Sequence, residues 1–181
     1  MELIKTSLDG AFVIKPKVFR DERGFFTETY SKKKFSEMGI AADWVQDNHS
    51  MSTKKGVLRG LHYQLTPNTQ AKLVRATKGS VYDVIVDLRK DSATFGKWEG
   101  FELSAENFLM LYVPQGFAHG FCTLEDNTEF QYKCDNYYAP ESEGAIIWND
   151  PTLNINWPIS EPILSEKDAK AQKFAEFDSP F

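Results

Sequence analysis

The feature that most constrains the fold is a succession of short β-forming segments, separated by turn residues about every eight to twelve positions. This spacing is typical of β-sandwiches and β-barrels, in which each strand crosses the structure once before the chain turns back. The expected strands are Ala11–Lys15, Phe25–Ser31, Trp44–Ser52, Val57–Gln64, Gln70–Lys78, Ser80–Leu88, Trp98–Leu103, Phe108–Val113, Phe117–Leu124, Thr128–Tyr137 and Gly144–Trp148. No repeat or Gly/Ser-rich linker divides them, so we expect a single domain over residues 1–181.

Two of these stretches favour a double-layered structure. Val81–Leu88 is apolar on both faces, as expected of a strand covered on both sides. Val113–Phe121 places Pro and Gly between two apolar strands, which predicts a tight corner. We therefore predict a mainly β fold, a jelly-roll sandwich or barrel.

Two short helices are expected at the periphery. Lys32–Met38 mixes charged and apolar residues at helical spacing, and Gly39 supplies a stop. Glu166–Phe174 follows Ser165, a good N-cap residue, and Asp168 stands three residues after that cap as in a variant of the capping box.

The charge balance excludes some classes of partner. The chain has 21 basic and 26 acidic residues and a net charge of −5, so no overall field attracts it to nucleic acid. An anionic ligand must then be held by a local cluster.

Cys122 and Cys134 are too few for a disulfide framework and are expected to be reduced core thiols. Neither a signal sequence nor a long apolar span is evident, so we predict a cytoplasmic protein without membrane association.

Histidine spacing argues against a metal site. Small β-barrels that bind a metal often use a His-x-His pair followed by Glu and a distant His. Here His49, His62 and His119 are scattered along the chain, and no Cys/His cluster has zinc spacing. We predict no metal, while convergence of the three histidines in space stays open as the alternative.

The segment Val57–Gln64 carries ionisable residues within a predicted strand. Strict alternation would place His62 on the interior face with Leu58 and Gly60, and Arg59 on the opposite face. A bulge at Gly60 would turn both side chains inward. The alternative is a hydrogen-bonded core histidine beside a solvated arginine.

Lys72, His119 and Tyr132 also share the phase of apolar neighbours. The in-phase neighbours are Val74 and Ala76 for Lys72, Phe117 and Phe121 for His119, and Phe130 and Cys134 for Tyr132. Each of the three alone could be a satisfied core residue. An interior that holds all of them with His62 and Arg59 would be a poor core, and it indicates a site instead.

Several ordered motifs resemble one family. They are Leu58–Gln64, Lys72–Arg75, Gly79–Val84, Val113–Phe121 and Tyr132–Cys134. Together they closely resemble the dTDP-4-dehydrorhamnose 3,5-epimerase family over about residues 3–175. The resemblance implies a cupin-like jelly roll without metal or other cofactor, and a homodimer. It also implies conversion of dTDP-4-dehydro-6-deoxy-D-glucose into dTDP-4-dehydro-L-rhamnose, a step of dTDP-L-rhamnose biosynthesis.

The family pattern assigns roles to particular residues. His62 would be the base, Asp168 would orient its ring, Tyr132 would be the acid on the opposite face, and Lys72 would stabilise the enolate oxygen. The same pattern gives as substrate-binding candidates Arg23, Glu28, Gln46, Asp47, Asn48, Arg59, Lys72, His119, Tyr138, Glu143 and Lys167.

Among these candidates, the resemblance assigns Arg23 and Arg59 to the diphosphate and Tyr138 to stacking on thymine. It also places Arg23 and Glu28 across a subunit boundary, in the partner's site. From the residues alone, Arg23, Glu28, Glu143 and Lys167 would be read as surface charges.

Two alternatives stay open. A non-catalytic sugar-binding jelly roll would use Tyr138 and Trp148 as a stacking platform, but the inward His62, Lys72 and Tyr132 argue against it. A relative that epimerises one carbon or isomerises the keto group would share the fold and the nucleotide. The presence of Tyr132 favours the double epimerase.

Overall fold

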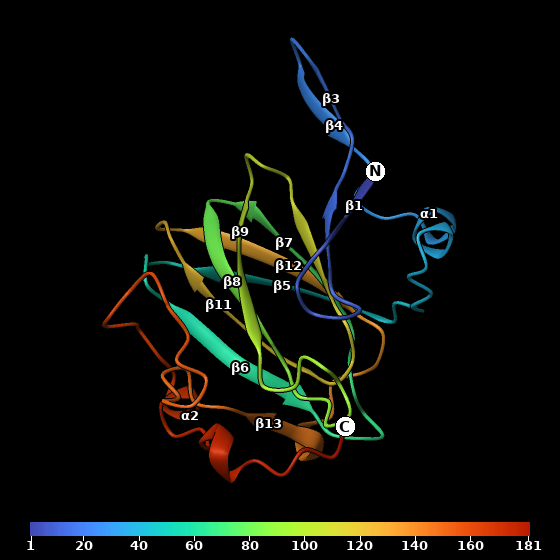
Figure 1. Cartoon of the computed structure of the whole chain (residues 1–181). Coiled ribbons are helices and arrows are strands. Elements are labelled where there is room, and N and C mark those ends of the chain that lie inside the picture. The colour runs from blue at the N-terminus through green and yellow to red at the C-terminus, as the bar shows by residue number, and fades with distance from the viewer.

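Two antiparallel sheets lie face to face in the computed structural model, which describes residues 1–181 (Figure 1). The six-stranded sheet has the order β1-β2-β10-β7-β12-β5, and the five-stranded sheet has the order β13-β6-β11-β8-β9. The strands of the larger sheet are β1 (Glu2–Lys5), β2 (Phe12–Lys15), β5 (Gln46–Ser52), β7 (Lys72–Lys78), β10 (Met110–Val113) and β12 (Thr128–Cys134). Those of the smaller sheet are β6 (Leu58–Gln64), β8 (Ser80–Asp87), β9 (Trp98–Ser104), β11 (Phe117–Thr123) and β13 (Glu143–Ala145). The predicted mainly β jelly roll is confirmed.

The main core fills the space between the sheets, and a second core covers the smaller sheet from outside. Strand β8 shows both: Val81 and Ile85 point into the inner core, whereas Val84 and Val86 pack in the outer one. The outer core is completed by the C-terminal segment, which runs beneath β6 and β13 in Figure 1. This double cover explains why the strand is apolar on both faces.

The peripheral elements differ in part from the expectation. Helix α1 (Lys32–Glu37) forms as predicted, and strands β1 and β3 (Val18–Asp21) were not expected. Helix α2 is only Glu166–Ala169, shorter than predicted, because the chain turns inward and the backbone N–H of Phe174 bonds Asp150 at 2.8 Å. A short 3₁₀ turn, η2 (Phe174–Glu176), follows, and another, η1 (Pro140–Ser142), precedes β13.

The ends of the other strands differ by one or two residues, and by more in β4, β12 and β13. The expected Phe25–Ser31 strand is β4 (Gly24–Thr27), which pairs only with β3 in a hairpin that projects from the sandwich (Figure 1). Strand β12 ends at Cys134 rather than Tyr137, and β13 ends at Ala145 rather than Trp148.

The structure also shows the state of the cysteines and the length of the helices. Cys122 and Cys134 are free and buried, as expected of reduced core thiols. No helix is long and apolar enough to cross a membrane.

Candidate active site

A cavity of about 640 Å³ opens between the two sheets and collects most of the predicted site residues. Its walls come from strands β5, β6, β7, β11, β12 and β13, and from the segment that carries α2. The predicted residues that line it are Gln46, Asn48, Arg59, His62, Lys72, His119, Tyr132, Tyr138, Glu143, Lys167 and Asp168. Arg23, Glu28 and Asp47 do not line it.

A bulge in β6 explains why Arg59 and His62 reach the same cavity. Arg59 pairs with Phe121 and His62 pairs with His119, so β6 has one more residue than β11 between these pairs. The predicted bulge at Gly60 is confirmed, because Arg59 and His62 both line the cavity, whereas strict alternation would have put them on opposite faces. Leu58 packs in the outer core.

Gly60 makes the bulge possible. Its φ of +128° is unfavourable for other residues, and a Cβ there would lie 2.5 Å from Gly120 Cα. Two backbones therefore approach each other where only glycine fits.

His62 and Asp168 form a close polar pair in the cavity. His62 Nε2 lies 2.5 Å from Asp168 Oδ1, and Asp168 is buried. Burial raises the pKa of Asp168, but hydrogen bonds from His62, Ser165 and the Gly60 N–H outweigh it and leave the pKa below the usual value. The carboxylate is thus ionised and accepts the Nε2 proton of His62, so Nδ1 is the ring nitrogen on which the histidine can take up a proton.

The predicted cap of α2 is only half a capping box. Ser165 Oγ accepts the backbone N–H of Asp168 at 3.1 Å, as predicted. The Asp168 side chain bonds His62 instead of reaching back to the cap. The helix start therefore positions the carboxylate for the histidine.

Lys72 and Tyr132 face this pair from the other sheet. They stand on the neighbouring strands β7 and β12, whereas His62 stands on β6 of the smaller sheet. Burial raises the pKa of the Tyr132 phenol and lowers the pKa of Lys72. The hydroxyl of Tyr132 is therefore protonated at neutral pH, and the cavity has a proton acceptor and a proton donor on opposite walls.

Tyr138, Glu143 and Lys167 form a polar group at the open side of the cavity. The Tyr138 hydroxyl donates to Glu143 Oε2 at 2.7 Å, and the Lys167 ammonium pairs with the same carboxylate. Burial raises the pKa of Glu143, but the bonds from Lys167 and Tyr138 outweigh this and hold the carboxylate ionised. Tyr138 is 54% exposed, and an exposed tyrosine ring can stack on a planar ligand.

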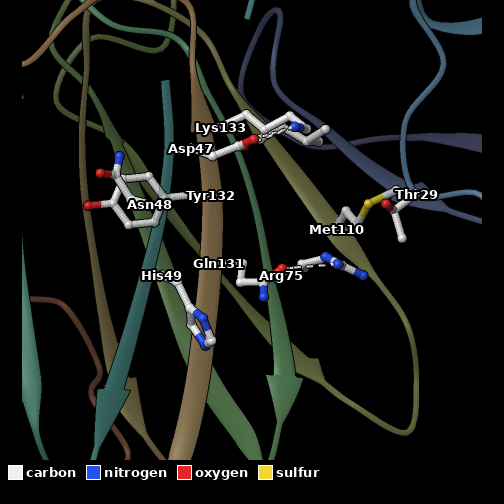
Figure 2. A pocket seen from close by; sticks show the side chains of 10 residues that line it. Thr29, Asp47, Asn48, His49, Arg75, Met110, Gln131, Tyr132 and Lys133 are labelled. Atoms are coloured by element: carbon white, nitrogen blue, oxygen red, sulfur yellow. Dashed lines mark hydrogen bonds and ion pairs between the residues drawn. The ribbon is translucent and has the colours of Figure 1, made fainter. Parts of the chain in front are cut away.

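Asp47 was predicted beside Gln46 and Asn48, but its side chain lies on the opposite face of β5. It pairs with Lys133 at 2.9 Å, next to a smaller hollow of about 340 Å³ on the outer face of the large sheet. Figure 2 shows Asp47, Lys133 and Arg75 on this side, whereas Asn48 and Tyr132 point to the other. The period-two alternation of the strand separates Asp47 from its two neighbours.

Arg23 and Glu28 also lie away from the cavity of their own chain. Arg23 is at the tip of the β3–β4 hairpin, paired with Asp21, and Glu28 pairs with Lys34. The hairpin projects from the sandwich in Figure 1.

The positions of His49 and Trp148 answer two other expectations, the convergence of the three histidines and the stacking platform with Tyr138. The three histidines do not converge, because His49 lies on the outer face of β5 and bonds Glu129 at 3.1 Å. Trp148 packs in the outer core and lines a separate hollow, so it forms no platform with Tyr138.

Asp83 is the residue of this region that the sequence reading missed. It is fully buried on β8, and both carboxylate oxygens lie 3.0 Å from His119 Nε2. The signal was present in the sequence, because Asp83 has the phase of Val81 and Ile85, both of the inner core.

The fold and the cavity together define a cupin-like jelly-roll protein with a proton-transfer site between its sheets. The family model of dTDP-4-dehydrorhamnose 3,5-epimerase matches residues 5–176. The dTDP-4-dehydrorhamnose 3,5-epimerase of Shigella flexneri is 55% identical over 179 residues, which cover 98% of each chain. That of Salmonella typhimurium is 56% identical over 173 residues, 94% of each chain. The chain belongs to the dTDP-4-dehydrorhamnose 3,5-epimerase family.

Solved structures give the same result in three dimensions. The 3,5-epimerase of Legionella pneumophila in complex with dTDP-4-keto-L-rhamnose superposes with a TM-score of 0.93 at 49% identity, covering 98% of this chain and 94% of that one.

A 3'-monoepimerase from Streptomyces bikiniensis also superposes, with a TM-score of 0.89 at 34% identity, covering 95% and 87% of the chains. In that structure a histidine and a tyrosine, spaced as His62 and Tyr132 are here, are replaced by asparagine and phenylalanine. Tyr132 therefore does not separate double from single epimerases, contrary to the sequence argument.

Proposed function

We propose that the protein inverts C3 and C5 of dTDP-4-dehydro-6-deoxy-D-glucose and so produces dTDP-4-dehydro-L-rhamnose. The observation that carries the proposal is the placement of His62 and Tyr132 on opposite walls of one cavity, with Lys72 beside Tyr132. Inversion of a carbon requires a proton to leave from one face and to arrive at the other. A base and an acid on facing sheets meet that requirement.

The reaction follows from the acidity of the protons next to a ketone. C3 and C5 both flank the C4 carbonyl, so His62 Nδ1 can take either proton while the electron pair moves into the C4–oxygen enolate. The Lys72 ammonium stabilises the oxygen as its charge develops. The Tyr132 hydroxyl then gives its proton to the carbon from the other side. Exchange with solvent restores the imidazole and the phenol before the second carbon reacts.

The rest of the cavity suits a nucleotide diphosphate. Arg59 is a guanidinium at the cavity wall without an ion pair in the chain, and it matches a phosphate oxygen pair. The exposed face of Tyr138 is available to thymine, and Glu143 and Lys167 fix the tyrosine hydroxyl at the edge. Gln46, Asn48 and His119 supply further polar groups along the wall.

The test is conversion of the purified substrate, followed by proton NMR. We expect a product inverted at both carbons, formed without added metal and in the presence of a chelator. A product inverted at C3 alone would assign the protein to the single-carbon class. No change in the sugar would favour a binding protein instead. The cytoplasmic location expected from the sequence stays a prediction.

In a homodimer, the β3–β4 hairpin would pack against the second copy of the chain. Phe19, Phe25 and Phe26 on this hairpin are 52%, 59% and 70% exposed. A projecting two-stranded hairpin with such aromatic area is unstable as a free surface, and it fits a second copy of the chain. Arg23 at its tip would then add a second guanidinium to the partner's cavity.

Mixing two inactive variants tests this exchange of residues. Arg23→Ala and His62→Asn should each be poorly active as homodimers. After co-expression about half of the dimers are mixed, and each mixed dimer has one site with both native residues if Arg23 serves the partner. Activity should then recover to about a quarter of the wild-type value. If Arg23 serves its own chain or the protein is a monomer, no activity returns.

A further inference from the structure

Asp83 and His119 form a second histidine–carboxylate pair at the cavity, apart from His62 and Asp168. Asp83 is on β8 and His119 on β11, which are paired strands of the smaller sheet (Figure 1). His119 is 7% exposed, lines the cavity, and presents Nε2 to both oxygens of Asp83 at 3.0 Å. The carboxylate accepts no other hydrogen bond from a side chain. Burial of a carboxylate with a single side-chain donor costs free energy, so a further interaction must offset that cost.

The positive charge of Lys72 helps to offset the cost of burying Asp83. Its ammonium faces the same interior and forms no ion pair, and the carboxylates whose charge acts on it are Asp83 and Glu143. Glu143 is already engaged by Lys167 and Tyr138. Asp83 is therefore the carboxylate near Lys72 whose only ion-pair partner is His119. Burial raises the pKa of Asp83 above its usual value, and the nearby His119 and Lys72 offset only part of that rise.

We propose that Asp83 is a positioning residue for this reaction: it orients the His119 ring in the cavity, and its negative charge keeps the Lys72 ammonium charged in the barrel interior. The first effect works through the hydrogen bond, which holds the proton on Nε2 and fixes the plane of the ring. The second works through charge, because a desolvated ammonium loses its proton easily unless an anion is near. The inference rests on the proposed function, since it concerns the same cavity.

Other groups face Lys72 and His119 and enter the pH dependence. These titratable or charged side chains are Arg59 and His62 on β6, Tyr132 and Cys134 on β12, and Glu143 on β13. Burial raises the pKa of Cys134 to about 11, so this thiol is neutral at working pH. Asp83 and Glu143 are thus the negative charges that face Lys72.

Asp83→Asn tests the proposal, because it removes the charge and keeps the volume. We expect kcat to fall roughly 10–100-fold at neutral pH, as is usual when the carboxylate behind a functional histidine is lost. We also expect the alkaline limb of the kcat profile to move to lower pH by about one unit, because Lys72 then loses its proton more easily. Asp83→Glu, which restores the charge, should return the limb toward the wild-type position.

Asp87→Asn is the matched control, since Asp87 is a buried aspartate on the same strand that bonds Arg89, Ser92 and Thr94. It should lower thermal stability without moving the limb. A purely structural Asp83 would behave in the same way, and an unmoved limb in Asp83→Asn would overturn the assignment.

Nitrogen NMR of the ligand-free wild-type protein gives a readout that needs neither a variant nor turnover. His119 should carry a proton on Nε2, and its ring signals should change in Asp83→Asn while those of His49 stay the same. A wild-type His119 without a proton on Nε2 would contradict the pairing. Failure of the wild-type protein to turn over the sugar would refute the proposed function and leave this result standing.

Discussion

His62→Asn should abolish both epimerisation and exchange of the sugar protons with solvent. The asparagine amide cannot accept a proton from carbon, so no enolate forms at C3 or C5. Loss of a general base costs roughly 10²–10⁴ in rate. The measurement is proton NMR of the keto sugar in heavy water, which reports exchange and inversion in one experiment.

His49→Asn is the matched control for this variant. His49 stands on the outer face of β5, bonded to Glu129 and remote from the cavity wall. Its replacement should leave exchange and inversion at wild-type rates. Near-normal exchange in His62→Asn would mean that another group removes the protons.

Tyr132→Phe should separate exchange from inversion. The phenyl ring fills the same volume but has no proton to donate. His62 can still remove a proton, exchange it with solvent and return it to the same face. Deuterium should therefore enter the sugar at C3 and C5 while inversion falls by roughly 10²–10⁴.

Tyr137→Phe serves as its control, because Tyr137 is 65% exposed and does not line the cavity. This variant should behave as wild type. If Tyr132→Phe inverts both carbons at a normal rate, the acid is a different residue or a water molecule.

The architecture was predictable because most of its strands show alternating or continuous apolar residues bounded by turn residues. Val81–Leu88 is apolar on both faces, and the structure covers both faces. The edge strand β1 and the hairpin strand β3 are short and largely exposed, so no alternation identified them. The end of α2 depends on Asp150, which is remote in sequence and bonds the Phe174 backbone. Contacts of that kind cannot be read from a local pattern.

In the site, too, regular strand alternation could be read from the sequence. Alternation correctly placed Lys72, His119 and Tyr132 at the interior, since their strands are regular there. Strict alternation alone does not give the phase of Arg59 and His62, but the bulge predicted at Gly60, which adds a residue to one strand, does.

Two acids show what strand alternation adds to the family pattern. The family pattern gives Asp47 together with Gln46 and Asn48, whereas the alternation of the strand turns the side chain of Asp47 to the outer face. Asp83 stands in an apolar run typical of core, yet it has the inward phase and bonds His119.

The central claim is that one protein inverts two carbons by proton transfer across a single cavity. The most direct measurement incubates dTDP-4-dehydro-6-deoxy-D-glucose with the wild-type protein in heavy water and locates deuterium in the product by NMR. The account predicts deuterium at both C3 and C5 of a sugar with the L-rhamno configuration. Deuterium at one carbon only, or inverted product that retains its original protons, would contradict it.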